Sequence, residues 1–190
     1  MMKYVVMTFC ILVTLAFIWV WHHQTQFNDH SRQAHFHIKN GELDDAIEAY
    51  TKAIRYKKRA ILLPEEPSVY NNLALAYLRT DDYDQAVETF KTVIAMKPDA
   101  VQAHINLGTA YLKQNRADLA IDACQDALRI APNSALVRYN LACAYALTGQ
   151  NEQAIDSLKR AIEGNPGIKA LLHEENAFDK LRTHPQFPAE

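Results

Sequence analysis

Hydrophobic and polar residues follow two different patterns along the chain. Residues 4–21 read YVVMTFCILVTLAFIWVW, a run without a charged side chain. From about residue 30 onwards, apolar residues instead recur at spacings of three and four, which is the period of one face of an α-helix. We therefore predict an all-α protein in which one apolar helix precedes a series of amphipathic helices.

The apolar run is long enough for a membrane anchor. As a helix it reaches roughly 27 Å, close to the thickness of a hydrocarbon core. Tyr4 at one end and Trp19 and Trp21 at the other resemble the aromatic belts of membrane interfaces. A cleaved signal peptide and a buried soluble helix are the alternatives, but the run exceeds the usual apolar core of a signal peptide, and tryptophans stand where a cleavage site needs small residues. We predict an N-terminal tail (1–3) and an uncleaved transmembrane anchor (4–21).

Charges flanking the anchor give its orientation. Lys3 and the α-amino group favour an N-terminus inside the cell, whereas the nearest cations on the other flank are Arg32 and Lys39. The bulk of the chain is then expected outside the cytoplasm. We interpret residues 22–29 as a short polar linker.

A 34-residue period organises the rest of the chain. Pro64, Pro98, Pro132 and Pro166 recur with this period. It also relates Asn72, Asn106 and Asn140; Leu73, Leu107 and Leu141; Tyr77, Tyr111 and Tyr145; and Ala86, Ala120 and Ala154. Each of the units 67–100, 101–134 and 135–168 contains two helical patterns joined by a short turn. The middle residue of the turn is Asp81, Asn115 or Gly149, which suits a left-handed backbone conformation.

This period and these residues resemble the tetratricopeptide repeat. The resemblance implies antiparallel helix pairs that stack into a right-handed superhelix, and it covers roughly residues 30–190. Residues 30–66 form a degenerate first unit with a six-residue insertion late in its second helix, since Ala46 and Pro64 lie farther apart in sequence than Ala86 and Pro98, their equivalents in the next unit. Residues 169–190 are expected to form a capping helix, and their ending resembles those of bacterial members of the family.

The resemblance also implies a concave groove, lined by the first helix of each unit, that binds a protein or peptide. The predicted groove residues are Asn71, Asn72, Leu75, Leu78, Arg79, Ile105, Asn106, Thr109, Leu112, Lys113, Tyr139, Asn140, Cys143 and Leu147. The asparagines can donate to and accept from a peptide backbone, and Arg79 and Lys113 favour an acidic ligand. The alternative is that the asparagines stabilise helix contacts and the remaining residues are solvated surface. The cations with which some family members grip a terminal carboxylate are absent, which argues against that kind of clamp.

Net charge excludes one class of partner. The chain carries a formal charge of −2 with a pI of about 6.4, so nothing attracts nucleic acid globally. One local exception is the basic run at 55–59, which reads RYKKR. It could meet anionic lipid or an acidic partner, although a solvated helix end is the favoured interpretation.

Reactive side chains do not form a recognisable catalytic or metal-binding motif. His30, His35 and His37 are close in sequence, but no spacing of a known metal site includes them, and we expect no metal and no cofactor. Cys124 is interpreted as a small buried hydrophobe, with a disulfide to Cys143 as the alternative. We expect no enzyme activity. The predicted function is a membrane-anchored scaffold, in the bacterial inner membrane with periplasmic repeats, that acts in assembly of a cell-envelope complex. The alternative is an accessory, non-catalytic subunit of a membrane enzyme, secretion or biosynthesis complex.

Overall fold

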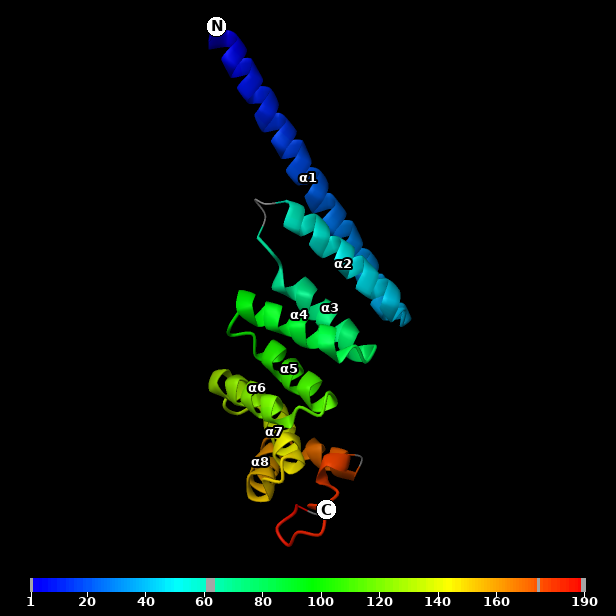
Figure 1. The fold of residues 1–190 in the computed structure, drawn as a ribbon, viewed down its shortest axis with the longest axis vertical. Helices are drawn as coiled ribbons and strands as arrows, with labels where there is room; N and C mark the ends of the chain where they lie inside the picture. Colours follow the sequence, from blue (N-terminus) through cyan, green and yellow to red (C-terminus); the bar gives the residue numbers. More distant parts are fainter. Residues whose placement is uncertain (1, 61–63, 174, 189–190) are drawn as a thin grey trace. The chain divides into compact units, whose positions relative to one another are not determined.

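The protein consists of helices joined by turns and short loops in the residues that its computed structural model describes, which are 2–60, 64–173 and 175–188. Within those ranges no strand is present. The elements, labelled in Figure 1, are α1 (Met2–Asn40), α2 (Leu43–Arg59), α3 (Pro67–Arg79), α4 (Tyr83–Met96), α5 (Val101–Lys113), α6 (Ala117–Ile130), α7 (Ala135–Leu147), α8 (Asn151–Gly164), and the 3₁₀ segments η1 (Pro166–His173) and η2 (Asn176–Phe178). Each of the three regular repeats contains two helices where two were predicted, and α5 packs against α6 and α7 against α8. The chain divides into two compact units, Met1–Thr80 and Asp81–Glu190.

The first unit is built on a long helix. α2 packs in the antiparallel direction along the second half of α1, and α3 packs against α2. The core of this unit consists of Phe27, Ala34, Ala46, Ala49, Tyr50, Ala53, Val69 and Leu73. Small alanines dominate it because the helices approach closely. Phe27 and Tyr50 fill the larger spaces.

α1 is continuous from Met2 to Asn40, which corrects the predicted linker. Residues 22–29 are helical, and His23 and Phe27 within them are buried. The first half of α1 contains apolar side chains that stand in the open, such as Leu12 at 65% and Phe17 at 71% exposure. By length and composition, α1 is able to cross a membrane. Met1, in the predicted N-terminal tail, lies outside the described residues.

The insertion in the first repeat is only partly helical. α2 has 17 residues, whereas α4, α6 and α8 have 14 each. The extra sequence therefore lengthens the helix by less than one turn, and the remainder belongs to the segment before Pro67. Residues 61–63 of that segment lie outside the described part of the chain.

The predicted turn geometry is confirmed. Asp81, Asn115 and Gly149 have φ values of 60°, 57° and 76°, and Gly41 in the degenerate first repeat has 79°. A residue in this conformation ends one helix and lets the chain turn before the next begins. α5 and α6 also pack closely: a Cβ atom built on Gly108 would lie 3.1 Å from Cys124 Sγ, a contact tighter than side chains normally make.

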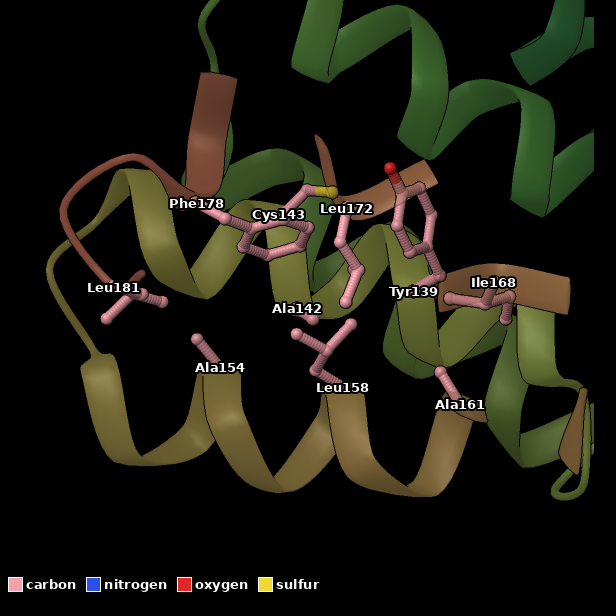
Figure 2. Close-up of a cluster of buried hydrophobic side chains, with 10 residues drawn as sticks. All are labelled: Tyr139, Ala142, Cys143, Ala154, Leu158, Ala161, Ile168, Leu172, Phe178 and Leu181. Carbon is pink, nitrogen blue, oxygen red and sulfur yellow. The ribbon is translucent and has the colours of Figure 1, made fainter. Parts of the chain in front are cut away.

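The C-terminal cap differs from the predicted capping helix. It consists of the 3₁₀ segments η1 and η2 followed by turns. Figure 2 shows its apolar side chains over α7 and α8, where Ile168, Leu172, Phe178 and Leu181 are buried with Leu158 of α8. The cap thus covers the apolar face at the end of the array, as predicted. Residues 174, 189 and 190 lie outside the described part.

Candidate functional site

Three of the predicted groove residues of α3 line a hollow in the first unit. Asn72, Leu75 and Arg79 lie on its wall with Ala76, and the facing helices contribute His35, Ile38 and Tyr50. Its volume is about 240 Å³, below the range of roughly 300–1,000 Å³ typical of small-molecule sites. We call these seven residues the α3 hollow. Asn71, also predicted, is half-buried on the same helix but does not line it.

Polar groups in the α3 hollow are held by a chain of hydrogen bonds. His35 Nδ1 donates to the Ser31 carbonyl at 2.7 Å, which leaves Nε2 to accept from Asn72 Nδ2 at 3.4 Å. Burial raises the pKa of the Tyr50 phenol, and a hydrogen bond with Asn72 acts in the opposite direction. Tyr50 therefore stays neutral. Arg79 is exposed and has no acidic partner among the described residues, so its charge is available at the rim.

Sequence reasoning missed the α1 and α2 side of this hollow. His35, Ile38 and Tyr50 belong to the degenerate repeat, whose first helix departs from the pattern of the others. Only His35 could have been found from its position in the repeat. It occupies in the first repeat the position that Leu75, Thr109 and Cys143 occupy in the others.

The predicted groove residues of α5 differ in accessibility. Lys113 is exposed and Thr109 is half-buried, whereas Ile105 is only 6% exposed and belongs to the core. Asn106 accepts a hydrogen bond from Gln102 Nε2 at 3.0 Å, but its own Nδ2 is buried without a partner in the described part of the chain. An unpaired buried amide is uncommon, since it loses its hydrogen bonds to water.

The predicted groove residues of α7 are largely covered. The C-terminal cap lies over them, and the Phe178 ring meets Tyr139 edge to face with centroids 5.9 Å apart. Tyr139 and Cys143 are 8% and 4% exposed. Both residues are therefore part of a closed core, and the sequence-based expectation that they face an open groove is wrong in this structure. Leu147 remains exposed at the end of α7.

Two of the repeated asparagines make contacts between helices. Asn140 Nδ2 donates to Thr109 Oγ1 at 3.0 Å, which joins α7 to α5. The bond from Asn72 to His35 joins α3 to α1 in the same register. The alternative role for the asparagines, stabilisation of helix contacts, thus applies to Asn72 and Asn140.

A second cluster of polar groups lies at the turn between α1 and α2. His37 Nδ1 and Glu42 Oε2 are 2.6 Å apart, and Asp45 brings a further carboxylate oxygen within 4.8 Å of both. These three groups could offer ligand atoms to a divalent cation, an arrangement that the sequence spacing did not reveal. The contact between His37 and Glu42 already pairs two of them, and both carboxylates are exposed.

Both cysteines of the repeats are free and buried. The alternative of a disulfide between Cys124 and Cys143 is therefore not realised. Burial raises the pKa of the Cys124 thiol to about 12 and also raises that of Cys143. Each is a neutral thiol at physiological pH and packs as a small apolar side chain.

Comparison with known families identifies the repeats. Three models described as "Tetratricopeptide repeat" match residues 29–99, 71–135 and 111–173. Together they span residues 29–173, well over half of the chain. The chain belongs to the tetratricopeptide repeat family. Proteins built of such repeats are generally non-catalytic scaffolds for other proteins.

Solved structures with the same fold include MamA (41-end) from Desulfovibrio magneticus RS-1, with a TM-score of 0.71 and 22% identity over 82% of this chain and 85% of that one. The thermophilic tetratricopeptide protein TTC0263 of Thermus thermophilus has a TM-score of 0.64 and 23% identity, covering 82% and 83%. YrrB, described as a tetratricopeptide protein with an unusual peptide-binding site, has a TM-score of 0.64 and 18% identity, covering 84% and 79%. At these identities the likeness shows the fold. A comparison with curated proteins gives no match.

Proposed function

We propose that this protein is a membrane-anchored scaffold that binds a partner protein through the α3 hollow. The apolar half of α1 would hold it in the bacterial inner membrane, with the repeats in the periplasm, where it would assist assembly of a cell-envelope complex. The observation that carries the binding role is the α3 hollow, which apolar side chains line together with the exposed cation Arg79.

The chemistry of the α3 hollow suits an extended peptide with an apolar residue next to an acidic one. Ile38 and Leu75 supply apolar surface, while Arg79 offers a guanidinium that can hold a carboxylate with two parallel hydrogen bonds. The volume fits side chains rather than a whole small molecule. The description of YrrB as having a peptide-binding site agrees with this use of the fold.

Single substitutions test the α3 hollow. Tagged full-length protein, extracted in mild detergent, would be compared with Leu75→Glu and Arg79→Glu for the proteins it recovers from membranes. Leu75→Glu places a charge among the apolar side chains of the hollow, and Arg79→Glu reverses the charge at the rim, so both should reduce recovery of the partner by at least about fivefold. Lys159→Glu is the matched control, because Lys159 is an exposed cation on α8.

The α5 positions are tested separately by Asn106→Ala combined with Lys113→Ala. Loss of the partner in this double variant would assign α5 to the binding surface as well. A set of recovered proteins that is the same for the wild type, both α3 variants and Lys159→Glu would refute binding through the α3 hollow.

A further inference from the structure

The C-terminal end of α2 lies beside the part of α1 that directly follows the apolar run. Lys57 Nζ donates to Gln24 Oε1 at 3.1 Å and lies 4.5 Å from the centre of the Phe27 ring. The Tyr56 ring stacks on His30, with centroids 5.4 Å apart. Gln24 is three residues after Trp21, about 5 Å along a helix axis. The end of α2 lies beside the middle of α1 (Figure 1), and Gln24, which it contacts, is about one helical turn past the apolar run.

Three exposed cations lie at this end of α2. Arg55, Lys58 and Arg59 are exposed, and no ion pair with an acidic side chain occurs for any of them within the described residues. We call these three residues the basic end of α2. Lys57 between them is buried and is used internally, since it pairs with Glu66 Oε1 at 3.0 Å. The nearby carboxylates are also engaged, because Glu65 accepts from the Tyr70 hydroxyl.

The helix dipole alone does not account for this concentration of charge. It favours cations at the end of every helix, yet the last turns of α4 and α8 contain none and that of α6 contains only Arg129. The last turn of α2 contains Lys57, Lys58 and Arg59. Among the second helices of the repeats, the strongly basic one is therefore the one that ends beside the apolar half of α1.

We infer that the basic end of α2 binds the anionic head groups of phospholipids in the leaflet on the repeat side of the membrane. This inference rests on the proposed anchoring by α1, which would place the end of α2 at head-group level. The distance of about 5 Å along α1 between the end of the apolar run and Gln24 is shorter than the Debye length of about 8 Å at physiological salt. The electrostatic attraction between the basic end of α2 and the lipid phosphates therefore reaches the membrane surface. Long lysine and arginine side chains can also extend toward the phosphates. Lipid binding would hold the first repeat against the membrane.

Hydrogen exchange of the full-length protein in lipid nanodiscs tests the inference. We expect amides at residues 54–60 to exchange about three- to tenfold more slowly in discs with about one third phosphatidylglycerol than in pure phosphatidylcholine discs. Salt at about 0.5 M should remove the difference, because it shortens the Debye length. The triple variant Arg55→Glu/Lys58→Glu/Arg59→Glu should show no difference between the two lipids.

The experiment also needs a matched control variant and a separate measurement of whether α1 is inserted in the membrane. Lys159→Glu/Lys169→Glu/Lys180→Glu reverses three exposed cations of the second unit and should keep the lipid effect. Trp19 and Trp21 are the only tryptophans, so quenching of their fluorescence by brominated acyl chains reports insertion of α1 alone. Quenching together with equal exchange in both lipids would overturn the lipid contact and leave the anchor in place. Absence of quenching would overturn the anchor and this inference with it.

Discussion

Left-handed residues at the repeat turns are a residue-scale feature with a measurable effect. Asn115 has φ 57° between α5 and α6, a conformation that asparagine tolerates and β-branched residues do not. Asn115→Val should therefore lower the free energy of unfolding by about 1–2 kcal/mol, measured by urea denaturation in detergent micelles. Asn115→Gly is the control and should be at least as stable as the wild type. Equal stability of the two variants would contradict the strain assigned to this turn.

Burial of Cys124 gives the folding stability a dependence on alkaline pH. The pKa of this thiol is raised from 9.0 to about 12 in the folded state, so the unfolded state releases the proton first as the pH rises. The stabilisation that the buried neutral thiol gives to the folded state is complete below about pH 9 and is lost between pH 9 and 12. At pH 10 the stability advantage of the wild type over Cys124→Ala should be about 1 kcal/mol smaller than at pH 7. An advantage that is the same at both pH values would contradict a buried neutral thiol.

At the scale of elements, the contact between α5 and α6 limits side-chain size. Ala120 is fully buried where the two helices meet, near the close approach of Gly108 and Cys124. Ala120→Leu should therefore lower the free energy of unfolding by roughly 1–3 kcal/mol through overpacking. Asp122→Leu, at an exposed position of the same helix, is the control and should change it little. The placement of Ala120 would be wrong if both variants melted at the wild-type temperature.

Elements that repeat were predictable, whereas single elements were not. α3 to α8 followed from the 34-residue period, since each position was read from several copies. The degenerate repeat had no such support. The sequence of residues 22–29 is mostly polar and predicts a linker, but His23 and Phe27 within it pack against α2 as part of the continuous α1. The irregular structure of the cap was not predicted for the same reason, because the cap occurs only once in the chain.

The candidate site shows the same limit. The positions on α3 were found by register, and three of them line the α3 hollow. Cys143 on α7 has the register of Leu75 and Tyr139 that of Asn71, but the cap covers both α7 residues and places Phe178 against Tyr139. A groove position is open only when no other segment covers it, and the sequence period contains no information about a segment outside the repeats.

At the scale of the whole molecule, orientation in the membrane determines which partners the repeats can meet. Lys3 directly precedes the apolar run, whereas Arg32 lies about 16 Å beyond Trp21 along the continuous α1. Along the sequence, the positive charge nearest the apolar run is therefore N-terminal, which favours an N-terminus inside the cell. The basic end of α2 does not oppose this, because it follows the apolar run at a distance in sequence well beyond the flanking stretch that sets orientation.

A topology reporter tests this orientation. We expect alkaline phosphatase, fused after the last residue and expressed in bacteria, to be active, because it folds only in the oxidising periplasm. A cytoplasmic fluorescent reporter at the same position should be dark. Lys3→Glu combined with His22→Lys moves positive charge across the anchor and should lower phosphatase activity severalfold. Lys159→Glu, far from the anchor in sequence, should leave it unchanged. An inactive phosphatase fusion to the wild-type chain would place the repeats in the cytoplasm, and periplasmic partners would then be excluded.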